Sequence, residues 1–219
     1  MHGGSGGGLR TDSWLWNGTD WTLHPIAGPA LPGSFLQTTV QREGYVVAHD
    51  RGKTFRWNAG WTQLEDATAV VSPRFAASGA VDLAGRRVLI HGGAENSTTT
   101  ASSISWTGTW QRLGNTAVDS SPGRVQSAAM TYDVVRRQFV HFGGFSTTTS
   151  SVVNDTWVYD GAWSKKLPGA PLPAPRFGHV LVYDAAGDRS VLFGGAGFGA
   201  SLPRMIPRSS GVPTGVDEK

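Results

Sequence analysis

The chain has 219 residues, of which 39% are hydrophobic, 16% are charged and none is cysteine. This composition supports a folded core and excludes wholesale disorder, and the lack of cysteine excludes disulfides, thiolate metal sites and cysteine nucleophiles. A net charge of +3 from scattered cations does not predict nucleic-acid binding, which needs a clustered basic face. With 30 glycines and 12 prolines, the chain favours many short strands joined by turns over a helix bundle. No apolar run reaches the roughly 20 residues of a membrane span, and the first residues lack the pattern of a signal peptide.

The first predicted element is an aromatic hairpin from Asp12 to Trp21. The residues before it, Met1-His2-Gly3-Gly4, align with the end of a strand that recurs later as Ile90-His91-Gly92-Gly93. A Gly/Ser linker or tag is the alternative interpretation. We favour the strand, because Asp12-Ser13-Trp14 follows where the next strand is due.

The second group of elements lies between residues 34 and 64 and is shorter than the later ones. We predict strands at 35–40 and 45–49, followed by an aromatic hairpin from Lys53 to Trp61. The Asp box of sialidases is resembled by the segment Asp50-Arg51-Gly52-Lys53-Thr54-Phe55. The segment lies between the second and third predicted strands, however, whereas the sialidase box lies between the third and fourth. We therefore interpret it as a structural turn.

Three later groups share a strict register. Each has an apolar run that ends in Gly-Gly, and the three pairs begin at Gly92, Gly143 and Gly194, 51 residues apart. An aspartate lies ten residues before each pair, and an arginine lies eight or nine residues before each aspartate. We expect one strand from arginine to aspartate, with the aspartate capping the turn that follows. The residues concerned are Arg74, Arg124 and Arg176, and Asp82, Asp133 and Asp184.

A second aromatic signal follows the Gly-Gly pairs and also marks the first two groups. All nine tryptophans fall in three columns of aligned positions. Aromatic residues two apart on a strand share one face, so we expect these columns to pack between neighbouring sheets. The first column holds Trp14, Phe55, Ile104 and Trp157, the second Trp16, Trp57, Trp106 and Tyr159, and the third Trp21, Trp61, Trp110 and Trp163.

This pattern resembles the kelch repeat, an apolar strand ending in Gly-Gly followed by spaced Tyr or Trp at a period of about 50 residues. The resemblance covers residues 1–195 and implies an all-β, kelch-type β-propeller of about four blades, each a four-stranded antiparallel sheet. We place repeats near 34–64, 72–113 and 121–167, with partial blades at 1–24 and 174–195. Kelch propellers usually have five to seven blades, so we expect either a small closed ring or an incomplete propeller whose open blade edges self-associate.

The residues from 196 to 219 leave the repeat. Asn-Asp-Thr is due about ten residues after Gly195, but Arg204-Met205-Ile206-Pro207 stands there. If these codons read CGA ATG ATA CCN, a shift of two bases restores Asn-Asp-Thr. We therefore predict an irregular tail that is a frameshifted remnant of the next hairpin.

The arginine column is the strongest candidate for function. In family members that bind partners, arginines at the start of the innermost strand lie near the channel mouth, and Arg74, Arg124 and Arg176 match that position. Their forked guanidinium groups suit carboxylates; the alternative is that they brace the blade. His179 matches a position that is often His in the family. The Ser/Thr-rich loops at 95–100 and 146–151 are further candidates for ligand contact.

Catalysis has weaker support in the sequence. Galactose oxidase-like relatives need a Tyr–Cys cofactor, which a chain without cysteine cannot form. Strand alternation places His91 and His141 on different sides, which argues against a shared metal site. A sugar epimerase or mutarotase needs an acid or base beside an arginine, and only Glu95, Arg74 and His179 offer this. A carboxylate, an arginine and a histidine around a deep channel would favour this enzyme.

We therefore predict a binding module for a protein or carbohydrate ligand, acidic in character, with Arg74, Arg124, Arg176 and His179 as binding residues. The prediction includes no catalytic residue, metal or cofactor, and no nucleic-acid partner. A carbohydrate-active propeller enzyme, of the epimerase, mutarotase, lyase or sialidase kind, is the alternative. Bacterial relatives of this type are often secreted, so the resemblance implies a secreted or cell-surface protein.

Overall fold

A computed structural model describes residues 2–5, 9–24, 40–42, 45–50, 53–57, 61–66, 71–72, 74–82, 84–85, 87–95, 97–114 and 121–197. Every regular element in these ranges is a β-strand, and every pairing between strands is antiparallel. Within the same ranges there is no helix with the length and apolar character needed to span a bilayer. The expectation of an all-β protein is therefore confirmed.

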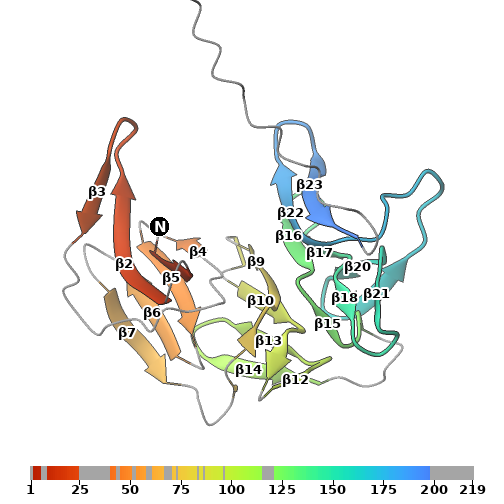
Figure 1. The fold of residues 1–219 in the computed structure, drawn as a ribbon, viewed down its shortest axis with the longest axis horizontal. Coiled ribbons are helices and arrows are strands. Elements are labelled where there is room, and N and C mark those ends of the chain that lie inside the picture. Colours follow the sequence, from red (N-terminus) through yellow and green to blue (C-terminus); the bar gives the residue numbers. More distant parts are fainter. Residues whose placement is uncertain are drawn as a thin grey trace, which may run out of the picture.

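The strands form five principal sheets in chain order (Figure 1). The first sheet holds β1 (His2–Ser5), β2 (Leu9–Trp16) and β3 (Trp21–His24), and the second holds β4 (Val40–Arg42), β5 (Tyr45–Asp50), β6 (Lys53–Trp57) and β7 (Trp61–Asp66). The third holds β9 (Ser78–Asp82), β10 (Arg87–His91), β13 (Ser103–Trp106) and β14 (Trp110–Leu113). The fourth holds β16 (Ala129–Asp133), β17 (Gln138–Phe142), β20 (Thr156–Tyr159) and β21 (Trp163–Lys166), and the fifth holds β22 (Phe177–Asp184) and β23 (Arg189–Ala196).

Two small sheets accompany the third and fourth sheets. One contains β8 (Arg74–Phe75), β11 (Ala94–Glu95) and β12 (Thr98–Thr99), and the other contains β15 (Val125–Gln126), β18 (Phe145–Ser146) and β19 (Ser151–Val152). Each is built from the start of the first strand and the loop after Gly-Gly. The two Ser/Thr-rich loops are therefore short hairpins tied to the arginine segments.

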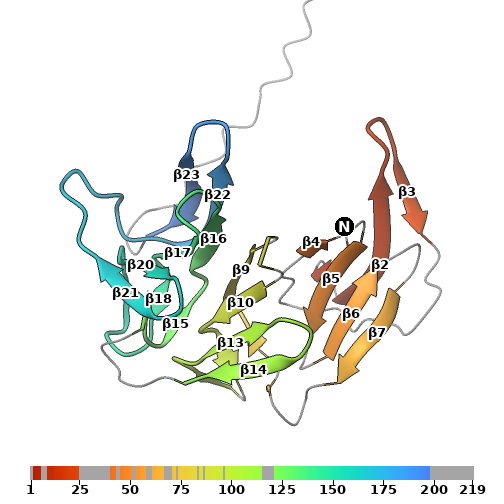
Figure 2. The ribbon, with the colours of Figure 1, turned by 180° about the vertical axis from the view of Figure 1, so that it is seen from behind.

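The principal sheets follow one another around the molecule, each a meander of neighbouring strands (Figures 1 and 2). Along the inner side, β9 lies against β16, and β16 lies against β22. The first and fifth sheets lie apart in both views. This arrangement is consistent with a β-propeller-like fold, and the described residues do not show a closed ring.

The expected first strand from arginine to aspartate is wrong for the third and fourth sheets. It breaks into β8 and β9, and into β15 and β16, around Ala76 (φ 54°) and Ser127 (φ 52°). Gly178 (φ 64°) is the equivalent residue of the fifth sheet, but there the strand is not broken, because β22 includes Gly178. The amide of Ser127 donates to the Ala76 carbonyl (2.7 Å), and that of Gly178 donates to the Ser127 carbonyl (2.8 Å). The left-handed residue thus directs one backbone hydrogen bond from each sheet to the next. The hydrophobic pattern of the sequence does not encode this bond.

The Gly-Gly pairs are explained by close backbone approach. A Cβ on Gly92 or Gly143 would lie 2.5 or 2.7 Å from a carbonyl oxygen of the next sheet, that of Val125 or Arg176. Gly93 and Gly144, the second glycines of these two pairs, have a positive φ as well, and their amides donate to the same carbonyls at 2.8 Å. Only glycine combines this conformation with this contact, so the 51-residue spacing marks the junctions between sheets.

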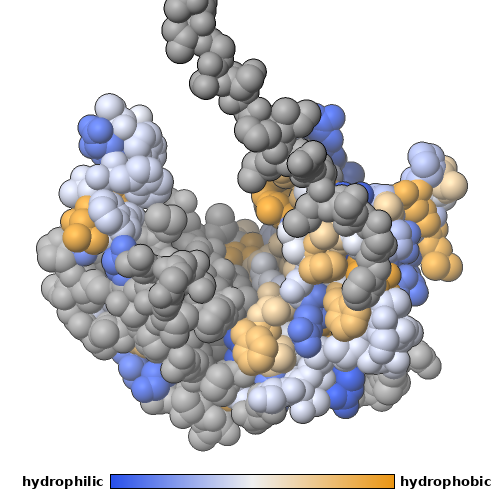
Figure 3. All heavy atoms as spheres, in the orientation of Figure 1, coloured by the Kyte–Doolittle hydropathy of each residue, from blue (hydrophilic) through white to orange (hydrophobic). Residues whose placement is uncertain are grey.

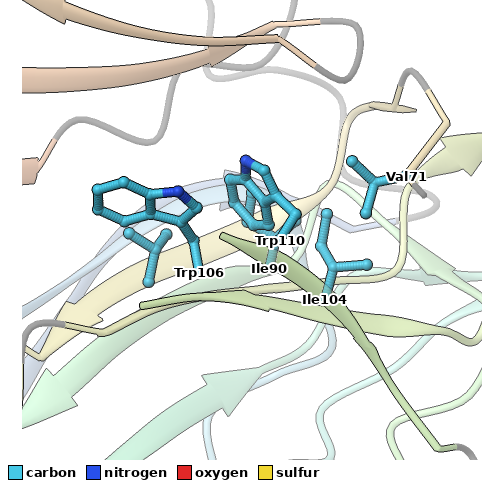
Figure 4. Close-up of a cluster of buried hydrophobic side chains, with 6 residues drawn as sticks. Val71, Ile90, Ile104, Trp106 and Trp110 are labelled. Atoms are coloured by element: carbon cyan, nitrogen blue, oxygen red, sulfur yellow. The ribbon is translucent and has the colours of Figure 1, made fainter. Parts of the chain in front are cut away.

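The aromatic columns pack between sheets, as expected, in the third and fourth sheets, whereas Trp16 and Trp21 of the first sheet are exposed. The second and third columns pair directly across each hairpin, as Trp16 with Trp21, Trp57 with Trp61, Trp106 with Trp110, and Tyr159 with Trp163. In the third sheet, Trp106 and Trp110 form a buried cluster with Val88, Ile90 and Ile104 (Figure 4). On the opposite face of the same sheet, Ala80 and Leu89 pack against Met130, Tyr132 and Phe139 of the fourth sheet.

The repeat aspartates cap turns, as predicted. Asp82 accepts from the amide of Gly85 (2.8 Å), Asp133 from those of Val135 and Arg136, and Asp184 from those of Ala186 and Gly187. Each carboxylate thereby satisfies the backbone of the turn into the second strand.

The amino-terminal residues take the register expected of a strand end. His2 pairs with Ser13 as His91 pairs with Ser103, which supports the alignment of Met1–Gly4 with Ile90–Gly93. The strand predicted at 45–49 is present as β5. The strand predicted at 35–40 and the tail from residue 198 onward, with the frameshift hypothesis, lie outside the described residues apart from Val40 in β4.

Candidate functional site

Arg74 is buried in β8, the short strand that precedes β9 of the third sheet. Its guanidinium donates to the carbonyl of Ser102 (2.7 Å), contacts the Ser102 hydroxyl and lies 3.3 Å from the Glu95 carboxylate. Burial lowers its pKa to about 10, although the charge of Glu95 opposes this shift. Glu95 also binds Arg112, and these hydrogen bonds and charges outweigh burial and lower the pKa of Glu95. The guanidinium of Arg74 is therefore neutralised inside its own sheet.

Arg124 and Arg176 are placed differently. Arg124 is exposed and donates to the Thr99 carbonyl of the preceding sheet's loop (2.8 Å). Arg176 is half-buried and donates to the carbonyls of Ala174 (3.1 Å) and Gly194 (3.0 Å). Within the part of the chain that the structure describes, neither side chain has a carboxylate partner. The position of Glu95 is occupied by Ser146 in the next repeat and by Gly197 in the one after, so neither arginine finds a carboxylate there.

The β18–β19 hairpin lies between these two arginines. The amide of Thr147 donates to the Arg124 carbonyl (3.0 Å), and the amide of Arg176 donates to the Val153 carbonyl (3.3 Å). The hairpin presents hydroxyl groups on Thr147, Thr149 and Ser151, of which the last two are 2.8 Å apart. We call Arg124, Arg176 and these three hydroxyl residues the arginine edge. Beside it, Arg176, Ser151 and Pro175 line a cavity of about 560 Å³.

His179 and Glu95 do not come together with an arginine as an acid–base site would require. His179 is buried, and its ring packs edge-on against Phe142 of the fourth sheet (centroids 5.5 Å apart). Burial lowers its pKa. Glu95 does meet Arg74, but in a buried ion pair between β11 and β8. The structure thus unites two of the three candidate acid–base residues and places the third at another junction.

The expectation that strand alternation separates His91 from His141 is wrong. The two rings lie 5.5 Å apart, edge to face, and each packs against Trp163. They do point to opposite faces of their own sheets, but those faces oppose each other across the junction of the third and fourth sheets. Both are buried, and burial lowers the pKa of His91 to about 3 and that of His141 well below its usual value.

A hydrogen-bonded chain determines the tautomer of His91. The Trp163 indole Nε1 donates to Ser103 Oγ (2.9 Å), and this hydroxyl lies 2.8 Å from His91 Nδ1. His91 Nε2 lies 3.1 Å from the Gly123 carbonyl, which only accepts. The proton is therefore on Nε2, and Ser103 donates to Nδ1. Both ring nitrogens are committed, and no group of three or more potential metal ligands occurs within the described residues.

The Trp163–Ser103 bond belongs to a repeated contact that sequence reasoning missed. Trp61 Nε1 donates to Ser13 Oγ (3.2 Å), and Trp110 Nε1 donates to Thr54 Oγ1 (2.5 Å). In each case a third-column tryptophan reaches a hydroxyl in the preceding sheet. The signal is present in the sequence, because a Ser or Thr stands immediately before each first-column residue, at positions 13, 54, 103 and 156.

The inner strands border a second cavity, of about 800 Å³, at the aspartate end. Its lining includes Asp82, Tyr132, Arg137 and Tyr183, and no histidine among the described residues. The hydroxyl of Tyr183 donates to Asp188 (2.6 Å), which raises the pKa of Tyr183 to about 12. The Arg136 guanidinium holds the pKa of Asp188 below its usual value. These polar groups are largely occupied by one another.

Comparison with protein-family models finds no match for the chain, and no curated protein matches it. The site is therefore interpreted from its geometry.

Proposed function

We propose that this chain is part of a kelch-type β-propeller that acts as a binding module and takes an acidic ligand at the arginine edge. The ligand is a protein segment or a carbohydrate that carries carboxylate or sulfate groups. The repeated four-stranded meanders and the glycine junctions at a 51-residue period support the fold assignment.

The contrast between Arg74 and its two counterparts carries the binding proposal. Arg74 has a carboxylate partner and is buried, so it braces its sheet. Arg124 and Arg176 have only carbonyl partners among the described residues and retain donors for a ligand. A guanidinium group pairs with a carboxylate through two parallel hydrogen bonds, which gives both affinity and orientation.

The hydroxyl residues between the two arginines suit the same ligand. Thr149 and Ser151 are neighbours on the short β18–β19 hairpin, and because one of their hydroxyls donates to the other, the pair has one O–H donor left for an oxyanion. The hairpin is hydrogen-bonded to the backbone of both arginines, which places the charged and hydroxyl residues next to one another.

Catalysis is a weaker proposal for this chain. An epimerase or mutarotase would place a carboxylate, an arginine and a histidine around the central cavity. The described lining of the 800 Å³ cavity supplies Asp82 and Arg137 without a histidine, and Asp82 is used to cap its turn.

Two anionic probes test the proposal and distinguish the ligand sources. A fluorescent hexaglutamate peptide represents a protein ligand, and a heparin-derived hexasaccharide represents a carbohydrate. Arg124→Ala combined with Arg176→Ala should weaken the preferred probe at least tenfold, because charge-assisted hydrogen bonds are worth about 1.5 to 3 kcal/mol each. Arg189→Ala, which removes an exposed arginine paired with Asp184, is the matched control and should change affinity less than twofold.

Binding that survives the double substitution unchanged would overturn the proposal, as would a failure of the wild-type chain to bind either probe. A single set of thermal melts shows that the variants remain folded.

A further inference from the structure

The segment that connects the fourth and fifth sheets is an exposed, apolar loop. It covers residues 167–175, between β21 and β22, and all of these residues are exposed. Leu167 is 87% exposed and Leu172 is 47% exposed. In Figures 1 and 2 this segment projects from the molecule beside β21, and Figure 3 shows apolar atoms at the surface there. We call residues 167–175 the proline loop.

The composition of the proline loop suits a binding surface. The loop contains four prolines and two leucines and no charged residue. Each proline fixes its own φ, so the loop loses less conformational entropy than an ordinary loop when a partner covers it. Exposed apolar side chains that are grouped in this way mark interaction sites.

The proline loop is tied to the fourth sheet and to Arg176. The side-chain amide of Asn154 donates to the Pro173 carbonyl (3.1 Å), and Arg176 Nε donates to the Ala174 carbonyl (3.1 Å). Asn154 follows the β18–β19 hairpin, which carries the hydroxyl residues of the arginine edge. The two hydrogen bonds therefore hold the last residues of the proline loop beside the arginine edge.

The cavity beside the arginine edge connects the loop to the charged group. Its volume is about 560 Å³. Arg176 and Ser151 contribute polar side chains to its lining, whereas Val152, Ala174 and Pro175 contribute apolar ones. A ligand that pairs with Arg176 in this cavity therefore has aliphatic surface next to its charged group.

This lining suits a protein segment better than a carbohydrate. A carbohydrate carries many hydroxyl groups, and each costs free energy when it is buried without a hydrogen bond. The described lining offers the Arg176 guanidinium and the Ser151 hydroxyl, with neither a carboxylate nor an aromatic ring. An aliphatic side chain has no such requirement, and it gains free energy by leaving water to contact Val152 and Pro175.

The charges around the loop indicate what accompanies the aliphatic side chains of the partner. Lys166 directly precedes the proline loop and Arg176 directly follows it, while the loop itself has no carboxylate. Lys166 is exposed and Arg176 is half-buried. A partner that covers the loop meets a cation at each end, which favours acidic residues beside its aliphatic ones.

Building on the proposed binding function, we propose that the ligand of the arginine edge is an acidic protein segment with aliphatic side chains, which the proline loop binds. Carboxylates of the segment pair with Arg176, and its aliphatic side chains cover Leu172 and Leu167. The arginine edge gives the segment its orientation, and the proline loop adds the apolar contact that selects a protein over a carbohydrate.

Two fluorescent peptides of equal length and charge test this proposal. One has the sequence Glu-Glu-Leu-Glu-Glu-Leu-Glu-Glu, and the other has serine in place of both leucines. The wild-type chain should bind the leucine peptide about ten- to thirtyfold more tightly, because its two leucines bury apolar surface on the loop. Leu167→Ser combined with Leu172→Ser should weaken the leucine peptide about five- to tenfold and change the affinity for the serine peptide less than twofold.

The matched control is Val134→Ser combined with Val135→Ser, which changes two exposed aliphatic side chains on the turn after β16. It should leave the affinity for both peptides within twofold of the wild-type values. Thermal melts of the two double variants show that each remains folded. A preference for the leucine peptide that survives the loop substitutions contradicts the proposal, as does an equal loss from the loop pair and the valine pair.

The arginine variant distinguishes this proposal from the proposed function. If Arg124→Ala combined with Arg176→Ala weakens both peptides but the wild-type chain binds the two peptides equally, the arginine edge binds acidic ligands without the loop, and only the present proposal is wrong. Tighter binding of the heparin hexasaccharide than of the leucine peptide would also overturn it alone. If the wild-type chain binds no anionic probe, the proposed function is wrong as well.

Discussion

The fourth and fifth sheets show how the same repeat position can be core in one place and surface in another. Phe142 and Phe193 occupy equivalent positions 51 residues apart, but the first is 5% exposed and the second 77%. The difference lies entirely in the neighbour, since the fifth sheet covers Phe142 and no described residue covers Phe193. Burial in this fold is therefore a property of the junction between sheets, and three matched pairs of substitutions and one pH titration test that conclusion.

The largest difference is expected between Phe142→Ala and Phe193→Ala. A buried Phe→Ala substitution costs about 3 to 5 kcal/mol in the free energy of unfolding, whereas an exposed one costs less than about 1 kcal/mol. Urea unfolding in dilute solution measures both. Equal losses would show that the two junctions are equally packed and would contradict the comparison.

Acidification should weaken the junction of the third and fourth sheets. Burial depresses the folded-state pKa of His91 and His141, so the unfolded chain takes up protons first and stability is lost as pH falls below about 6.5. Each histidine should cost about 1.4 kcal/mol by pH 5.5, and for His91 the loss continues toward its pKa of about 3. The variant His141→Phe should unfold with a shallower pH dependence over this range, and an unchanged slope would show that His141 is not buried as a neutral ring.

The junction glycines provide a second matched pair of substitutions. Gly143→Ala and Gly194→Ala both place Ala at a positive φ, which costs about 1 to 2 kcal/mol. Gly143→Ala should cost more, because its Cβ would also lie 2.7 Å from the Arg176 carbonyl oxygen, while Gly194→Ala meets nothing. Thermal or urea unfolding of the two variants decides the order, and a larger loss for Gly194→Ala would contradict it.

The smallest effect is expected at the indole donors. Trp163→Phe removes the hydrogen bond to Ser103 and should cost about 1 kcal/mol in the free energy of unfolding. Trp21→Phe is the matched variant in the exposed first-sheet hairpin and should be nearly neutral for the isolated chain. Its unfolding is measured at low concentration, where association does not contribute, and a loss as large as that of Trp163→Phe would reveal a partner for Trp21 within one chain.

Much of the fold could be predicted because it depends on local signals with a fixed period. Glycines at positive φ, aspartates at turns and aromatic residues across hairpins each act within one sheet or at one junction. The break at Ala76 and Ser127 could not be predicted in this way, because neither residue type signals a left-handed conformation and its partner is a carbonyl of another sheet.

The candidate site was predicted less completely. Sequence alignment grouped Arg74, Arg124 and Arg176, but the three are not equivalent. Arg124 lies one position earlier than the others when the aspartates are aligned, and Glu95 has no carboxylate counterpart in the next repeat. Whether an arginine pairs with a carboxylate of its own sheet or keeps donors for a ligand depends on the residue at the position of Glu95, which lies about 20 positions further along the chain.

The sequence by itself determined the all-β class, the 51-residue unit and the residues that mark its turns and junctions, because these depend on local conformation and on spacing. Only the tertiary structure decided that His91 meets His141, that Arg74 is neutralised by Glu95, and that the tryptophan indoles bond hydroxyls of the preceding sheet. Each of these contacts joins side chains from different strands, mostly across a junction, and which faces oppose each other there is set by how the sheets pack.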